Sequence, residues 1–393
     1  MSDAFILSAC RTPIGKFHGA LGSVPATRLG AIAIKAAIDR AGIAPDAVDE
    51  VILGQVLTAG VGQAPARQAA LAAGLPDTVA ALTINKVCGS GLKAVMLASQ
   101  AVRCGDANVI VAGGMESMSQ APWVLPREGP ALGDRELIDT MLHDGLECAF
   151  SGRSMGDIAE TTAERCGVTR EHQDDFALQS HRRAIAAIDG GRFADEIVPV
   201  TVTRGKATAT VATDEGPRRD SSPESLAALK PAFRPKGTVT AGNASMLSDG
   251  AAAVVVASAA IVERLDLRPM ARIRASVTVG GKPEDIFTAP VDAIRLVVQS
   301  GGLSLGEIDL YEINEAFAVQ MLACVRPLEL PPENVNVHGG AIALGHPIGA
   351  SGARVLVTLL HALEQRGTTF GVAALCLGGG NAVAMLVERV VAM

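Results

Sequence analysis

A cysteine at a glycine-rich turn is the first candidate for chemistry. Cys88 lies in the segment NKVCGSG, residues 85–91, which is typical of a turn from a strand into a helix. The first turn of a helix carries unpaired N–H groups and the positive end of the helix dipole, so we expect the pKa of this thiol to be lowered. Most free cysteines are instead small buried hydrophobic residues. Cys88 is therefore a candidate nucleophile that needs support from other residues.

A histidine in a second glycine-rich segment could supply a base. His346 lies in GGAIALGHPIGASG, residues 339–352. So many glycines predict an irregular loop of the kind that places a base or a hydrogen-bond donor. A structural histidine is the alternative. His346 has no partner at metal-ligand spacing, so we expect no metal site.

Two further polar residues follow predicted strands in the second half of the chain. Cys376 ends the apolar strand 372–375 and precedes three glycines, whose N–H groups could bind an oxyanion. A buried strand cysteine is the simpler interpretation. Asn314 follows another strand at an expected helix start, where asparagine is commonly an N-cap. Each residue alone thus has an ordinary structural explanation.

The elements around these residues look like two copies of one unit. The segments SGLK (90–93) and SGAR (351–354) each open a helical pattern, and apolar strands running into glycines follow at 109–114 and 372–380. The two helix starts are about 260 residues apart, as are other matching features of the two units. Chance similarity of βαβ patterns is the alternative. If the units pack about a pseudo-twofold axis, the candidate cysteine and histidine, just ahead of the two helices, converge.

The composition predicts a compact α/β protein in a reducing compartment. The chain has 393 residues, of which 49% are apolar, enough for roughly two or three domains that share a large core. A net charge of −7 gives no reason to expect nucleic acid or an anionic membrane as a partner. Seven cysteines without a CxxC pair argue against disulfides and zinc. Because the sequence shows no targeting peptide and no membrane span, we expect a cytoplasmic protein.

The middle of the chain differs in character from the start. Charged residues number 17 in residues 1–120 and 34 in residues 121–240, and the pattern of a buried strand returns at 251–257. We interpret the charged part as a solvated insertion. The predicted organisation is an N-terminal half of residues 1–118 completed by 249–270, an insertion of residues 119–248, and a C-terminal half of residues 271–393.

Together these segments resemble the thiolase family over essentially the whole chain. The motifs that carry the resemblance, in the order and spacing of the family, are NKVCGSG (85–91), GGMESMS (113–119), TAGNAS (240–245), NEAFA (314–318), GGAIALGHPIGASGAR (339–354) and CLGGG (376–380). The resemblance implies an α/β fold of duplicated units in a five-layer αβαβα arrangement with an inserted loop domain.

The resemblance also implies a role for each candidate residue. Cys88 would carry an acyl group as a thioester after His346 takes its proton. Cys376 would act as the acid and base of the carbon–carbon bond step. His346 and a water held by Asn314 would bind an enolate oxygen, while the backbone N–H groups of Cys88 and Gly378 would bind the tetrahedral oxyanion.

Coenzyme A would be a substrate and product, and we expect no resident cofactor. The expected partners are acetyl-CoA, free CoA and a 3-ketoacyl-CoA, which the charged insertion would hold. By resemblance, Arg218 and Ser225 border the nucleotide part of the ligand, and Met155, Ala241, Ser245 and Phe317 border the pantetheine channel. A solvated pair with no ligand is the alternative for Arg218 and its neighbour Arg219.

Three departures from the short-chain pattern of the family bear on the substrate. Ser154 stands where a histidine is common, FTAP (287–290) replaces Gly-Thr-Gly-Pro, and Asn381 follows the glycine triplet. Other segments, such as VPATRLGAIAI (24–34), look closest to acetoacetyl-CoA thiolases of the mitochondrial type. We therefore expect condensation of two acetyl-CoA molecules to acetoacetyl-CoA, or thiolysis of short 3-ketoacyl-CoA.

The same residues are also compatible with other functions. One is a degradative 3-ketoacyl-CoA thiolase of broader or longer chain length, and another is an inactive CoA-binding scaffold. A decarboxylating ketoacyl synthase is disfavoured because Asn314 replaces its second histidine. The apolar segment 122–126 around Trp123, together with the resemblance, suggests a homo-oligomer, namely a dimer of dimers.

Overall fold

Two similar halves of mixed sheet form the framework of this computed structural model, which describes residues 3–129 and 132–390. The strands of the first half are β1 (Ala4–Arg11), β3 (Glu50–Gly54), β4 (Ala80–Ile84), β5 (Val109–Ser117) and β10 (Ser248–Ser258). Those of the second half are β11 (Ala271–Gly280), β12 (Leu310–Ile313), β13 (Phe370–Leu377) and β14 (Asn381–Arg389). A short pairing of β1 with β11, at Phe5 and Ile6, joins the halves.

The strand order is the same in both halves. The first half runs β4-β3-β5-β10-β1 and the second runs β12-β13-β14-β11. Parallel pairs join β3 to β5 and β12 to β13, whereas β10 and β14 are antiparallel to both of their neighbours. In the position that corresponds to β4, Val335 makes a parallel bridge to Tyr311. The sheet therefore contains two copies of one unit.

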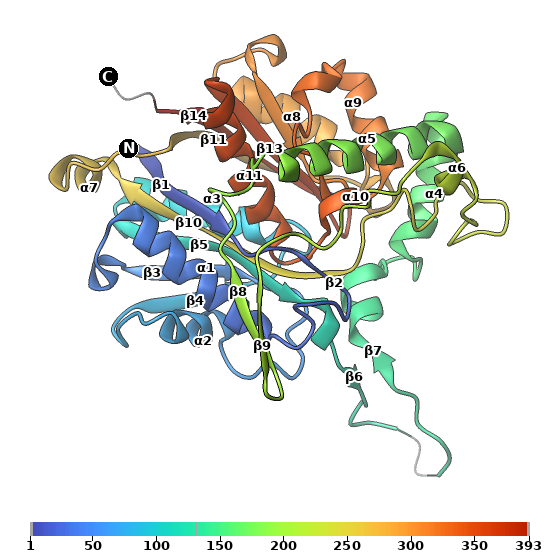
Figure 1. Ribbon diagram of the computed structural model, residues 1–393, viewed down its shortest axis with the longest axis horizontal. Helices are drawn as coiled ribbons and strands as arrows, with labels where there is room; N and C mark the ends of the chain where they lie inside the picture. Colours follow the sequence, from blue (N-terminus) through green and yellow to red (C-terminus); the bar gives the residue numbers. More distant parts are fainter. Residues whose placement is uncertain (1–2, 130–131, 391–393) are drawn as a thin grey trace.

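Helices fill the space between the two halves and cover their outer faces (Figure 1). The central helices α3 (Ser90–Cys104) and α11 (Ser351–Arg366) share one apolar core with the inner faces of both sheet halves. Helices α1 (Ala26–Ala41) and α2 (Pro65–Ala72) cover the first half, and α8 (Ala289–Ser300) and α9 (Ala318–Leu328) cover the second. This is the αβαβα arrangement that the resemblance implied.

The central helices approach each other through glycines at their first turns. A Cβ atom on Gly91 would lie 2.6 Å from the backbone nitrogen of Ala353, and one on Gly352 would meet the backbone nitrogen of Leu92 even more closely. Only glycine permits this approach. It brings the loops that precede α3 and α11 to one place, as the internal repeat predicted.

The inserted region lies over this framework and is tied to it by buried charges. Its elements are β6 (Trp123–Val124), β7 (Ile138–Asp139), the π-helix Met141–Leu146, α4 (Met155–Cys166), α5 (Arg170–Asp189), β8 (Val200–Arg204), β9 (Ala207–Val211) and α6 (Pro223–Ala227). Arg11 of β1 binds Glu196 at 2.5 Å and Asp214 at 2.7 Å. The division of the chain into domains, with residues 119–248 as the insertion, stays a prediction.

Short elements complete the described chain. They are β2 (Gly15–Lys16), α7 (Ala259–Arg264), α10 (Ala341–Leu344) and the 3₁₀ turns Pro45–Ala47, Met118–Gln120, Pro283–Asp285, Leu305–Glu307 and Pro332–Asn334. Within residues 3–129 and 132–390, no helix has both the length and the apolar character that a bilayer span requires.

Candidate active site

A mostly apolar pocket of about 180 Å³ brings three of the candidate residues together. Cys88, His346 and Cys376 all line it, although the first two come from loops of different halves and the third from the end of β13. The remaining walls include Phe317 and Ile348. A pocket that is largely apolar but holds a few convergent polar groups is typical of an enzyme site.

A strained turn presents Cys88. Val87 adopts a left-handed backbone conformation, with φ of 46°, which is costly for a β-branched residue. Ser90 holds the turn closed, because its Oγ accepts the N–H of Lys86 at 2.8 Å and donates to the carbonyl of Val87 at 2.6 Å. Helix α3 begins only at Ser90. The strain at Val87 was not predicted, since valine gives no sign of a left-handed turn.

The environment of the Cys88 thiol corrects the prediction of a lowered pKa. Burial raises the pKa of Cys88 to about 12, and the nearby Glu116 carboxylate adds to the increase. The backbone N–H groups of Cys88 and Gly378 act against it by hydrogen bonding. Desolvation therefore outweighs the helix start, so the resting group is a thiol that needs a base. The same two N–H groups are those that the resemblance assigned to the oxyanion.

A serine that the sequence did not single out fixes the tautomer of His346. Nδ1 of His346 lies 2.6 Å from Oγ of Ser351, and this Oγ lies 2.9 Å from the carbonyl of Pro347. The hydroxyl donates its only proton to the carbonyl, so it accepts from Nδ1–H and leaves Nε2 of the imidazole as an acceptor. Burial lowers the pKa of His346 to about 3, which keeps the ring neutral.

Asn314 lies beside the imidazole without lining the pocket. Its Nδ2 is 3.4 Å from Nδ1 and 3.5 Å from Nε2 of His346. Its Oδ1 is buried and has no hydrogen-bond partner among the residues that the structure describes. Because buried amide oxygens ordinarily have a partner, this atom is available to a water or a substrate.

The second cysteine lies at the end of β13, ahead of a glycine turn. Cys376 is buried, and burial together with the neighbouring Cys88 raises its pKa well above the ordinary value. Gly379 and Gly380 that follow have φ values of 82° and 79°. A Cβ atom on Gly380 would collide with the carbonyl of Lys282. The turn therefore requires glycine, and it returns the chain along β14 with the N–H of Gly378 directed at Cys88.

The residues expected to contact coenzyme A divide into two groups. Met155, Ser245 and Phe317 line the pocket. Arg218, Ser225 and Ala241 are exposed and lie outside it.

The exposed group belongs to the surface of the insertion. The N–H of Arg218 donates to Nδ1 of His181 at 3.2 Å, whereas Arg219 pairs with Asp189 at 2.5 Å. Ser225 exchanges hydrogen bonds with Ser222 as a helix cap. Contact between these residues and the nucleotide part of a ligand stays a prediction.

Two of the residues at which the sequence departs from the short-chain pattern lie in the pocket wall. Ser154 caps α4, where its side chain accepts the N–H of Asp157 at 3.2 Å. Phe287 packs edge-on against Phe317, with ring centroids 5.3 Å apart. Both residues line the pocket with Cys88, so they are placed to influence the size of an acyl group.

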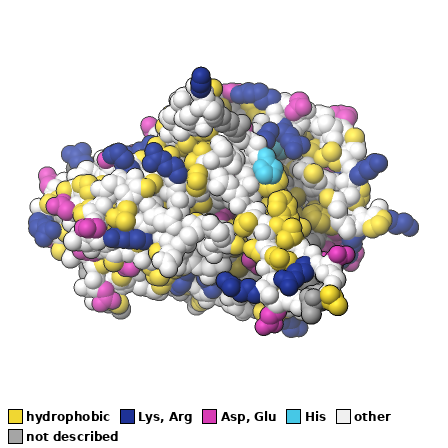
Figure 2. Space-filling view, turned by 90° about the horizontal axis from the view of Figure 1, so that it is seen from below, with side chains coloured by type: hydrophobic (Ala, Val, Ile, Leu, Met, Phe, Trp, Pro, Cys, Tyr) yellow, Lys and Arg dark blue, Asp and Glu magenta, His cyan; other side chains and the backbone are white. Residues whose placement is uncertain are grey.

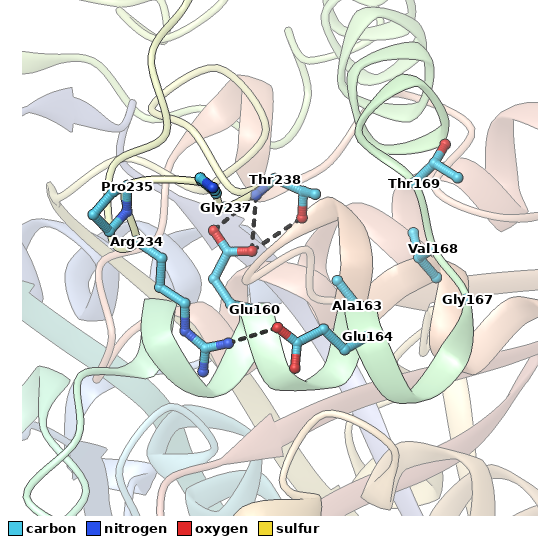
Figure 3. Close-up of a pocket in the computed structure, with 11 residues that line it drawn as sticks. Glu160, Ala163, Glu164, Gly167, Val168, Thr169, Arg234, Pro235, Gly237 and Thr238 are labelled. Carbon is cyan, nitrogen blue, oxygen red and sulfur yellow. Dashed lines mark hydrogen bonds and ion pairs between the residues drawn. The ribbon is translucent and has the colours of Figure 1, made fainter.

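A larger and more open pocket, of about 690 Å³, lies on the insertion (Figure 3). Three of its charged side chains already have partners: Glu160 accepts the N–H groups of Thr238 at 2.8 Å and Val239 at 2.9 Å, and Arg234 pairs with Glu164 at 2.8 Å. Among the residues that the structure describes, no cysteine or histidine lines it. The smaller pocket is therefore the candidate active site.

Comparison with models of protein families identifies the kind of protein that carries this site. The models for the thiolase N-terminal and C-terminal domains match residues 4–260 and 267–389. The chain belongs to the thiolase family. Its fold is that of a thiolase, so the fold predicted from the resemblance is confirmed.

Individual relatives match this thiolase from end to end. It is 54% identical over 392 residues to an acetyl-CoA acetyltransferase of Pseudomonas aeruginosa, and equally to one of Escherichia coli, with 99% of this chain and 100% of each relative covered. The crystal structure of the Bacillus anthracis acetyl-CoA acetyltransferase matches with a TM-score of 0.97 at 44% identity, covering 99% of both chains.

Proposed function

We propose that this thiolase condenses two molecules of acetyl-CoA to acetoacetyl-CoA, and catalyses the reverse thiolysis of short 3-ketoacyl-CoA, through an acyl group on Cys88. The observation that carries the proposal is the shared pocket of Cys88, His346 and Cys376, in which the imidazole keeps Nε2 as an acceptor. The names of the full-length relatives support the substrate class.

The first half-reaction transfers the acyl group to the enzyme. Nε2 of His346 takes the proton of Cys88, and the sulfur attacks the thioester carbonyl. The N–H groups of Cys88 and Gly378 stabilise the tetrahedral oxyanion. Cys376 gives its proton to the departing CoA sulfur, which leaves free CoA, a protonated imidazole and a Cys376 thiolate.

The second half-reaction forms the carbon–carbon bond. Burial makes the Cys376 thiolate a strong base, so it takes an α-proton from the second acetyl-CoA. The imidazolium of His346 and a water on Oδ1 of Asn314 bind the enolate oxygen while its carbon attacks the acyl group. Cys88 leaves as a thiolate and recovers its proton from His346, which restores the resting state.

The dimensions of the pocket favour a short acyl group. The pocket of about 180 Å³ is bounded by Phe287, Phe317 and Phe233. The ring of Phe317 packs edge-on against each of the other two. We propose a four-carbon preference with appreciable activity on five- or six-carbon or 2-methyl-branched ketoacyl-CoA. A degradative enzyme for longer chains is the alternative.

The direct test is a spectrophotometric assay of thiolysis with acetoacetyl-CoA and free CoA, with Cys88→Ala as the control. We expect turnover by the native protein and none by the variant. A native protein that prefers long ketoacyl-CoA supports the degradative alternative. Absence of thiolysis with short and long substrates supports an inactive CoA-binding scaffold and refutes the proposal.

We also propose that the thiolase assembles as a homo-oligomer, a dimer of dimers. The strands β6 and β7 belong to a hairpin that projects from the body (Figure 1) and carries exposed apolar residues, with Trp123 66% exposed and Leu132 91% exposed. Figure 2 shows hydrophobic side chains gathered on the face seen from below. Light scattering that gives a monomer at micromolar concentration would contradict this.

The surroundings that this mechanism needs are part of the proposal. Cys88 and Cys376 have to stay as free thiols, which a reducing compartment such as the cytoplasm provides. The steps above use side chains and backbone of this chain and one water, with coenzyme A as substrate and product, and the expectation of no resident cofactor stays a prediction.

A further inference from the structure

A buried glutamate next to the active site has no part in the chemistry described so far. Glu116 lies in β5 with its side chain fully enclosed. Its Oε2 accepts the backbone N–H of Val56 at 3.0 Å and of Gly349 at 2.9 Å, and its Oε1 accepts that of Leu57 at 3.2 Å. Glu116 therefore binds three backbone N–H groups that would otherwise be buried without a partner.

These three N–H groups belong to the two loops that enclose the nucleophile. Val56 and Leu57 follow β3 in the first half of the fold. Gly349 comes from the second half, between His346 and Ser351 in the sequence. Val56, Leu57 and Ile348 pack with Cys88 in one apolar cluster. The carboxylate thus joins the loop that carries the base to the wall beside the nucleophile.

The backbone around Glu116 and Gly349 is packed too tightly to allow another arrangement of the two loops. A Cβ atom on Gly349 would lie 2.7 Å from Oε2 of Glu116, 2.9 Å from Cα of Gln55 and 2.9 Å from the carbonyl oxygen of Met115. A Cβ atom on Gly54 would lie 2.8 Å from the carbonyl oxygen of Gly349. The backbones of the two halves are therefore in direct contact at this point, and Glu116 is the side chain that bonds them together.

The charge of Glu116 opposes the chemistry of its neighbour. Its carboxylate raises the pKa of Cys88, which hinders formation of the thiolate. Burial and the nearby Asp249 raise the pKa of Glu116 itself to about 7, against the three N–H groups that lower it. A group that hinders thiolate formation does not assist electrostatically, so its contribution to the site has to be geometric.

We propose that Glu116 is a positioning residue for acyl transfer, which holds the loop of His346 in register with Cys88. The inference rests on the proposed function, because it concerns the proton transfer from Cys88 to Nε2 of His346. A displacement of about 1 Å between reacting groups can slow a reaction by about a hundredfold. Loss of any of these three bonds to Glu116 should therefore impair acylation even in a folded protein.

The test compares two substitutions of buried carboxylates. Glu116→Gln keeps the shape and one acceptor oxygen, but it turns an NH₂ group toward one of the backbone N–H groups. Asp249→Asn is the matched control, because Asp249 lies on the adjacent strand β10 and binds the hydroxyls of Ser117 and Ser119 rather than the loop of His346. Thermal unfolding measures the structural cost of each change.

Two rates of reaction at Cys88 separate position from charge. Acetylation by acetyl-CoA requires His346 in place, whereas alkylation by iodoacetamide reports how readily the thiolate forms. For Glu116→Gln we expect acetylation to slow by about tenfold or more, while alkylation is unchanged or faster because a negative charge is gone. Asp249→Asn should keep its acetylation rate within about twofold of the native value.

The outcomes decide between the explanations. Acetylation of Glu116→Gln at the native rate, or an equal loss in Asp249→Asn, overturns the proposal. If Glu116→Gln does not fold, Gly349→Ala takes its place, because the added Cβ displaces Glu116 without removing its charge; acetylation by that variant at the native rate overturns the proposal as well. Failure of the native protein to become acetylated contradicts the proposed function instead.

Discussion

Replacement of Ser351 by alanine should slow acylation of Cys88 without altering the fold. The hydroxyl of Ser351 lies 2.6 Å from Nδ1 of His346 and makes Nε2 the free acceptor. Without it, the buried imidazole loses the bond that selects its tautomer, and the form with the proton on Nε2 cannot take the thiol proton. His346 is 7% exposed, so solvent does not readily replace the missing bond.

The size of the effect follows from that one bond. A buried hydrogen bond contributes about 0.5–1.5 kcal/mol net, and leaving its partner unsatisfied costs about 1–3 kcal/mol. Because each 1.4 kcal/mol or so corresponds to about a tenfold change in rate, acylation in Ser351→Ala should be about 10–100 times slower. The KM for acetyl-CoA should change little, since Ser351 does not line the pocket.

The assay is rapid-quench acetylation by acetyl-CoA, read as the fraction of acetylated Cys88 peptide in a mass spectrum. Ser180→Ala is the matched control, because Ser180 is also buried and bonds Glu315 at 2.6 Å but does not touch the imidazole. Both variants should lose about 1–3 kcal/mol of unfolding free energy, and only Ser351→Ala should lose acylation rate. Native rates in Ser351→Ala, or equal losses in both variants, would refute the role of the serine.

Three further predictions concern the thiols and the acyl pocket. Cys376→Ser should still accept an acetyl group on Cys88, because CoA can leave as a thiolate, but it should fail in condensation, because a serine hydroxyl cannot supply the base that takes the α-proton; normal condensation by the variant would contradict the assignment. Because burial raises the pKa of Cys88 to about 12, alkylation of the free enzyme should rise by about tenfold per pH unit between about pH 7 and pH 9, and a plateau in that range would show a lower pKa. Ser154→His should shift the profile of kcat/KM across a chain-length series by about 1–3 kcal/mol per methylene at the limiting length; an unchanged profile would mean that Ser154 does not contact the acyl group.

Much of the framework could be predicted because it depends on local sequence patterns. Apolar strands, glycine turns and helix starts recur at a constant offset, so the repeat indicated that Cys88 and His346 would meet. The glycines Gly91 and Gly352 at the helix crossing are the physical reason that they do. The fold of the family leaves few other ways to bury two such units.

Other features depend on contacts that no local pattern records. The pKa of Cys88 is set by burial under segments distant in sequence, so the helix start alone gave the wrong sign. The bond between His346 and Ser351 depends on the course of the loop between them. Glu116 lies within a recognised motif, but its three N–H partners come from both halves of the chain.

Peptide mass spectrometry after brief exposure to acetyl-CoA alone shows directly whether Cys88 carries the acyl group. We expect one acetyl group on the peptide that contains Cys88, its loss in Cys88→Ala, and its removal when free CoA is added. Acetylation of Cys376 and never of Cys88 would contradict the proposed mechanism.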